Sequence, residues 1–119
     1  MQDAVAFARA QGIRTGLISN SWGGRDYPAD VLERLFDVVL ISGEIGLRKP
    51  DAAIYERAAS ELQLEPAECI FVDDFHVNVE GAEAVGMTGI HHRSTEETLK
   101  ELEAFFALNF LDDVVDPAG

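Results

Sequence analysis

Three short polar clusters each follow an apolar run, and together they could bind a phosphorylated ligand. Paired carboxylates hold a hard cation such as Mg²⁺, a lysine neutralises phosphoryl charge, and hydroxyl and amide groups bind the remaining oxygens. Taken singly, each cluster is better explained by a turn, a helix cap or a solvated charge. In series they predict a site for Mg²⁺ and a small phosphorylated molecule. The clusters are Ser19-Asn20-Ser21, Arg48-Lys49 and Asp73-Asp74.

The runs before and between these clusters predict alternating strands and helices. Short apolar stretches predict four buried strands, at residues 15–18, 37–41, 69–72 and 88–91. Apolar residues at helical spacing predict helices over 3–11, 29–35, 79–84 and 95–108, and a further helix from Pro50 to Leu62. Within the last helix we expect Leu99, Leu102, Phe105 and Phe106 to face inward, and we expect residues 42–50 to form a loop.

This alternation predicts an α/β fold, a Rossmann-like parallel sheet in three layers with helices on both faces. Polar residues at the carboxyl ends of parallel strands line the usual ligand crevice of such a sheet, so the three clusters should converge there. A chain of 119 residues suits one domain. We expect the core to comprise residues 1–108 and a C-terminal tail to comprise residues 109–119.

Composition and charge exclude several partners. Nine basic and 22 acidic residues give a formal charge of −13, with the basic residues scattered along the chain, which argues against nucleic acid. Asp3 and Arg9 interrupt the N-terminal apolar residues and no later stretch is long enough to span a membrane, so a cytoplasmic location is the default expectation. Cys69 lies in an apolar run and is expected to be a small core residue.

The order and spacing of the clusters resemble the haloacid dehalogenase (HAD) superfamily of hydrolases over about residues 10–91. The segment 17–21 resembles the second motif of the family, and Gly46-Leu47-Arg48-Lys49-Pro50-Asp51 resembles the third. The resemblance implies that Ser19 binds the transferring phosphoryl group, that Asn20 helps to position the substrate, and that Lys49 stabilises the phosphoryl oxygens.

Phe71-Val72-Asp73-Asp74, with Asn78 four residues on, resembles the fourth motif, whose acidic residues ligate Mg²⁺. The resemblance makes Asp74 the better metal ligand, Asp73 a second ligand or the partner of the lysine, and Asn78 a supporting residue. The doubled aspartate is most similar to the N-terminal phosphatase domain of soluble epoxide hydrolases.

The first motif of the family, a strand that ends in Asp-x-Asp, does not occur in this sequence. In the family its first aspartate attacks phosphorus, and its strand lies in the centre of the sheet, between the strand before Ser19 and the strand before Asp73. Asp112-Asp113 is no substitute, because adjacent residues of an extended segment face opposite sides. The cap that selects substrates is missing too. The sheet is therefore expected to be incomplete: it must close up, borrow a strand or remain defective.

The resemblance implies that the chain is the C-terminal portion of a hydrolase whose lineage cleaves phosphomonoesters with Mg²⁺ through an aspartyl-phosphate, and that this chain alone is inactive. A non-catalytic module that binds Mg²⁺, phosphate or a protein is one alternative. A carbon-halogen hydrolase lineage is another. A strand-exchanged oligomer or a complementary N-terminal segment could supply the missing strand.

Overall fold

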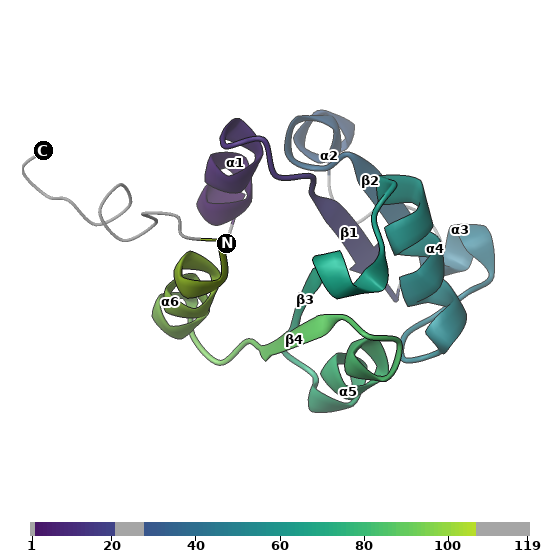
Figure 1. Ribbon diagram of the computed structural model, residues 1–119. Coiled ribbons are helices and arrows are strands. Elements are labelled where there is room, and N and C mark those ends of the chain that lie inside the picture. Colours follow the sequence, from purple (N-terminus) through teal and green to yellow (C-terminus); the bar gives the residue numbers. More distant parts are fainter. Residues whose placement is uncertain (1, 21–27, 107–119) are drawn as a thin grey trace, which may run out of the picture.

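The computed structural model describes residues 2–20 and 28–106, and within them helices and strands alternate (Figure 1). Residues 21–27 and the whole of the predicted tail, residues 109–119, therefore lie outside the described residues. The elements are α1 (Gln2–Ala10), β1 (Gly16–Ser19), α2 (Ala29–Leu35), β2 (Val38–Ile41), α3 (Ser42–Ile45), α4 (Ala52–Leu62), the 3₁₀ helix η1 (Pro66–Glu68), β3 (Ile70–Asp73), α5 (His76–Ala84), β4 (Thr88–His91) and α6 (Thr95–Phe106).

The four described strands form two separate parallel pairs. β1 pairs with β2, with Gly16 opposite Val38, and β3 pairs with β4, with Ile70 opposite Thr88. The residues that end β1 and β3 line one common pocket, so these two strands point the same way. The α/β fold class is confirmed, and the order across the molecule is β2, β1, a space, β3 and β4.

Helices form a layer on each side of the strands. α4 and α5 contact each other on one side, while α1 contacts α2 and packs against α6 on the other (Figure 1). The contact between α1 and α6 is a small apolar cluster in which Ala4 and Leu99 are buried and Phe7, Ala8 and Leu102 pack around them. The arrangement has the three layers that the sequence predicts.

The main core lies between α4, α5 and the strands. One face of α4 is buried, because its apolar residues recur at helical spacing. These residues are Ile54, Tyr55, Ala58 and Ala59. The ring of Tyr55 meets that of Phe71 edge to face, with centroids 5.2 Å apart. Cys69 belongs to the same core, as its apolar surroundings predict.

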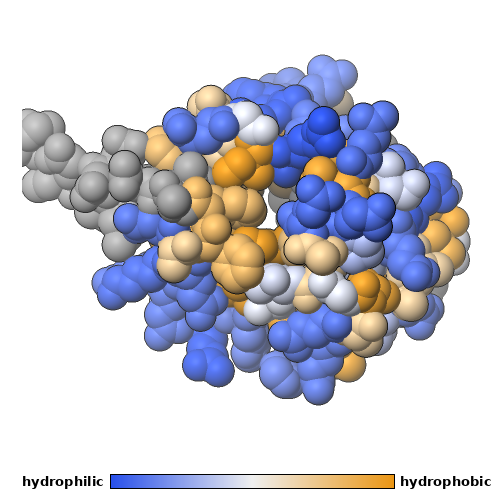
Figure 2. Space-filling view, in the orientation of Figure 1, coloured by the Kyte–Doolittle hydropathy of each residue, from blue (hydrophilic) through white to orange (hydrophobic). Residues whose placement is uncertain are grey.

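The space between β1 and β3 is a cavity of about 890 Å³. Gly16, Leu17 and Ile18 line it from one strand, and Ile70, Phe71 and Val72 from the other. Hydrophobic residues gather around the hollow between α1, α6 and the strands (Figure 2). Among residues 2–20 and 28–106 no strand lies between the two pairs, so the sheet of the described residues is incomplete, as the sequence predicts.

Three details differ from the sequence-based expectations. A single helical turn, α3, lies in the segment predicted as loop, and Gly46 ends it with a left-handed φ of 74°. α5 begins at His76, three residues before the predicted start. The prediction missed residues 76–78 because none of them is a buried apolar residue. Phe105 is 57% exposed and does not face inward, because the contact side of α6 follows Leu99 and Leu102.

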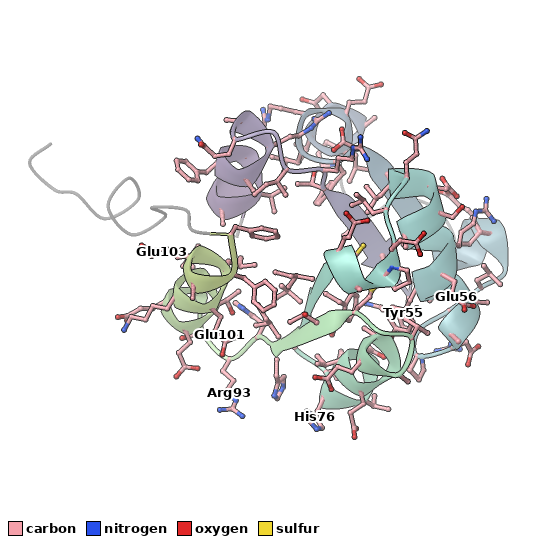
Figure 3. The ribbon with its side chains drawn as sticks, in the orientation of Figure 1. Tyr55, Glu56, His76, Arg93, Glu101 and Glu103 are labelled. Atoms are coloured by element: carbon pink, nitrogen blue, oxygen red, sulfur yellow. The ribbon has the colours of Figure 1, made fainter. Side chains whose placement is uncertain are left out.

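None of the helices within the described ranges is both long and apolar enough to cross a membrane. Charged side chains such as Arg93, Glu101 and Glu103 point outward from the molecule (Figure 3).

The hydroxyl of Tyr55 gives a test of the core. It donates a hydrogen bond of 2.7 Å to the carbonyl of Asn78 and so ties α4 to α5. Tyr55→Phe keeps the ring but leaves the buried carbonyl with one partner fewer, so we expect a loss of about 1 kcal/mol in the free energy of unfolding. Urea denaturation measures it. Glu56→Gln, on the exposed side of the same helix (Figure 3), is the control and should change stability little; equal losses in the two variants would contradict this account.

Candidate functional site

A second, smaller pocket of about 280 Å³ lies at the carboxyl ends of β1 and β3. Parallel strands bring their carboxyl ends to one edge of the molecule. Lys49 and Asp73, which follow Ser19 by 30 and 54 positions in the chain, therefore line the same pocket as Ser19. The six residues to which the sequence gives roles line this pocket, and Arg48 of the second cluster does not: the six are Ser19, Asn20, Lys49, Asp73, Asp74 and Asn78. Ser21 lies outside the described residues.

A buried ion pair forms the centre of the pocket. The Nζ atom of Lys49 lies 2.6 Å from Oδ2 of Asp73, and the two side chains are only 10% and 6% exposed. Nζ also lies 5.6 Å from the centroid of the Phe71 ring, within the range of a cation–π contact. Since a buried charge is costly unless it is paired and hydrogen-bonded, each of these partners helps to keep the lysine in place.

Asp73 has partners for both carboxylate oxygens. Oδ1 accepts the backbone N–H of Phe75 at 2.8 Å, and Oδ2 accepts a longer bond of 3.4 Å from the Asn78 amide in addition to the lysine. Burial raises the pKa of Asp73, but the bonds from Lys49 and Phe75 outweigh it and hold the pKa below its usual value. Asp73 is therefore ionised and is the direct partner of the lysine.

Asn20 fixes the backbone of the lysine. Its Oδ1 accepts the N–H of Lys49 and its Nδ2 donates to the carbonyl of Lys49, both at 3.0 Å. Both polar atoms of the amide are thus bonded to one residue, as in a pair of antiparallel backbone groups. This geometry suits the positioning of Lys49 better than the direct positioning of a substrate that the resemblance implies for Asn20.

Gly81 of helix α5 packs closely against Pro50, the residue after Lys49. A Cβ atom at Gly81 would lie 2.7 Å from the carbonyl oxygen and 2.8 Å from Cβ of Pro50, the residue after Lys49. The close approach therefore requires glycine. The Lys49-Pro50 peptide bond is cis. Gly81, Phe71 and the amide of Phe75 support the site through contacts that the sequence pattern does not reveal, although Phe71 lies within the quoted fourth motif.

Asp74 is the second carboxylate at the pocket, and its backbone carbonyl lies 3.0 Å from Nε2 of His91. Within residues 2–20 and 28–106 no cluster of three or more histidine, cysteine or acidic residues could hold a metal by itself. Mg²⁺ is usually bound by one or two carboxylates, with waters and substrate phosphate completing its octahedron. Asp74 fits that requirement as the single carboxylate, since both oxygens of Asp73 already have partners.

A family model described as haloacid dehalogenase-like hydrolase matches residues 1–86. The chain belongs to this family. Bifunctional epoxide hydrolase 2 of Rattus norvegicus is 31% identical over 117 residues, which cover 92% of this chain and 21% of the rat protein. Sesquiterpene phosphatase astK of Aspergillus oryzae is 44% identical over 68 residues, or 57% of this chain and 35% of astK. HAD-like phosphatases are thus among its relatives, and the chain spans only a minor part of either protein.

A solved structure shows the same fold in a chain of similar size. The crystal structure of an uncharacterized protein from Corynebacterium glutamicum matches with a TM-score of 0.83 and 33% identity, over 91% of this chain and 81% of that chain. The likeness confirms the HAD-type arrangement of strands and helices.

The ion pair predicts a pH dependence of stability. Because the pKa of Asp73 is lower in the folded state, its contribution is present above the unfolded pKa of about 3.9 and is lost as the pH falls through the folded value. Asp73→Asn leaves Lys49 buried without its anion, at a cost of roughly 3–5 kcal/mol at pH 7. Urea denaturation should show that the difference in the free energy of unfolding between the natural protein and Asp73→Asn shrinks below about pH 4. The exposed Asp30→Asn is the control, and a difference independent of pH would contradict the assignment.

The contact at Gly81 gives a second prediction. In Gly81→Ala the new Cβ meets backbone rather than a flexible side chain, so Pro50 and Lys49 must move, and we expect a loss of about 1–3 kcal/mol in the free energy of unfolding. Denaturation measures the loss, and the NMR amide signal of Lys49 reports the shift. Glu80→Ala, on the exposed side of the same helix, should leave that signal unchanged. An unshifted Lys49 signal in Gly81→Ala would refute the contact.

Proposed function

We propose that this chain forms the phosphate- and Mg²⁺-binding part of a HAD-type phosphohydrolase site, and that the reaction of its lineage is hydrolysis of phosphate monoesters. The observation that supports this most directly is the Lys49–Asp73 pair, held beside Ser19 and Asp74 in one pocket at the strand ends. The similarity to a sesquiterpene phosphatase supports the same reaction class.

The chemistry assigned to each group follows from its position. Lys49 and the hydroxyl of Ser19 would bind phosphoryl oxygens, because a cation and a donor line the same pocket. Asp74 would hold Mg²⁺, while Asp73, the other candidate ligand, bonds Lys49 and the Phe75 amide. The metal ion, when bound, neutralises phosphate charge and orients the ester. Asn20 and Asn78 keep Lys49 and Asp73 in place through the bonds already described.

The described part of the pocket contains no carboxylate that is suited to attack phosphorus. Asp73 uses both oxygens to bond Lys49 and the Phe75 amide, and Asp74 is assigned to the metal. Positioned charges stabilise a transition state but do not replace an attacking carboxylate in an aspartyl-phosphate mechanism. We infer that the 119-residue chain binds phosphate and Mg²⁺ without turnover, and that a strand from another segment or copy would be needed for hydrolysis.

Two other functions have less support. Carbon-halogen hydrolysis uses the same scaffold, but it gives no role to a second carboxylate beside Asp73. A module that associates with proteins alone would not need a buried Lys49–Asp73 pair at an open pocket.

Binding can be tested separately from turnover. We expect inorganic phosphate with Mg²⁺ to raise the melting temperature, since a ligand that binds only the folded state stabilises it by mass action. Asp74→Asn should reduce the rise that depends on Mg²⁺. Asp51→Asn, an exposed residue before α4, should retain it. Differential scanning calorimetry measures the shifts. No shift in the natural chain, or an equal shift in Asp74→Asn, would refute the proposed site.

A further inference from the structure

We propose that the side chain of Phe75 forms an apolar subsite of the phosphate pocket, where it contacts the organic group of a phosphate monoester. The bound molecule would then be an ester with an aryl or alkyl group, in preference to a small polar ester. The inference rests on the proposed function, because it needs the phosphoryl group to be held beside Lys49 and Asp74. The exposure of Phe75, its place in the pocket and its position in helix α5 carry it.

Phe75 is a large apolar residue that the fold leaves in water. It is 65% exposed, and within residues 2–20 and 28–106 only Val77 and Phe105 are other large hydrophobic residues with such exposure. A single exposed apolar side chain needs no explanation by itself. Phe75 differs from the other two because it lines the pocket that contains Lys49 and Asp74, and they do not.

Neither burial nor helix capping accounts for a phenylalanine at this position. Phe75 is the N-cap residue of α5, where Ser, Thr, Asp and Asn are favoured because their side chains accept hydrogen bonds from the first free N–H groups of the helix. A phenyl ring cannot accept such a bond, so the ring contributes less to the fold than a serine would. A role in ligand binding is the explanation that its place in the pocket supports.

The backbone of Phe75 is held in place on both sides. Its N–H donates to Oδ1 of Asp73 at 2.8 Å, and its carbonyl accepts the N–H groups of Asn78 at 3.1 Å and Val79 at 3.2 Å. The ring therefore starts from a fixed Cα position next to the carboxylate that binds Lys49.

The other exposed residues of the pocket already have roles. Among the described residues that line it, Asn20, Asp74 and Phe75 are exposed. The Asn20 amide bonds the peptide of Lys49, and Asp74 is assigned to Mg²⁺. A monoester that is bound by its phosphoryl group must extend its organic group toward the exposed part of the pocket. Phe75 is the residue that remains to contact it.

The chemistry of the ring sets the class of ester. Contact between the ring and an aryl or alkyl group removes apolar surface of both partners from water, and two aromatic rings also attract each other in edge-to-face or offset geometry. A glycerol group would lose water from its hydroxyl groups against the ring without gaining a hydrogen bond. Phe75 therefore favours apolar esters.

Calorimetric titration of the full chain in the presence of Mg²⁺ tests this preference with phenyl phosphate and glycerol phosphate, two monoesters of the same charge. We expect the natural chain to bind phenyl phosphate about five to ten times more tightly. Phe75→Ser keeps the amide that bonds Asp73, so it should abolish the preference and leave the affinity for inorganic phosphate unchanged. Because serine is a favoured N-cap residue, the variant should resist urea at least as well as the natural chain.

Val77→Ser is the matched control. Val77 is 57% exposed in the first turn of the same helix, but it is not among the described residues that line the pocket, so the preference should persist in this variant. Equal affinities of the natural chain for the two esters, a preference that survives Phe75→Ser, or a loss of stability in Phe75→Ser would overturn the inference. If inorganic phosphate still binds, the proposed function survives that result. If inorganic phosphate does not bind the natural chain, the proposed function fails and the inference fails with it.

Discussion

The buried ion pair between Lys49 and Asp73 connects the two halves of the molecule, and both the fold and the pocket depend on it. Lys49 follows β2, its peptide is held by Asn20 at the end of β1, and its ammonium group reaches Asp73 at the end of β3. A contact between the two strand pairs is needed at this edge because no backbone ladder joins β1 to β3 in the described structure. The same contact places a cation, a carboxylate and a hydroxyl around one pocket.

The open centre of the sheet is the second constraint. Unpaired backbone groups at roughly 1–3 kcal/mol each would soon exceed a typical total stability of about 5–15 kcal/mol, so some occupant of the cavity is required for a stable chain. The Corynebacterium structure matches 91% of this chain and 81% of its own, so the described helices and strands recur in a solved structure.

Much of the fold was predictable because its signals are local. Buried parallel strands of four residues appear as short apolar runs, and the boundaries of α2 and β4 agree with the periodicity. The first turn of α5 carries no such signal. Phe105 lies on the exposed side of α6, and its apolar side chain gives no indication of this in the sequence. The convergence of the three polar clusters was predictable from strand polarity. The double bond of Asn20 to the Lys49 peptide and the packing of Gly81 on Pro50 were not, because they depend on the path of a loop between distant elements.

The central claim is that this chain keeps the binding part of a phosphohydrolase site without its nucleophile. Its most direct test is the Mg²⁺-dependent hydrolysis of an aryl phosphate by the purified chain, with mass spectrometry to verify its length. Our account expects no hydrolysis above the rate of an Asp74→Asn sample prepared in the same way. Hydrolysis by the natural chain that Asp74→Asn abolishes would contradict it, since a carboxylate within these 119 residues, or in a second copy, would then be attacking phosphorus.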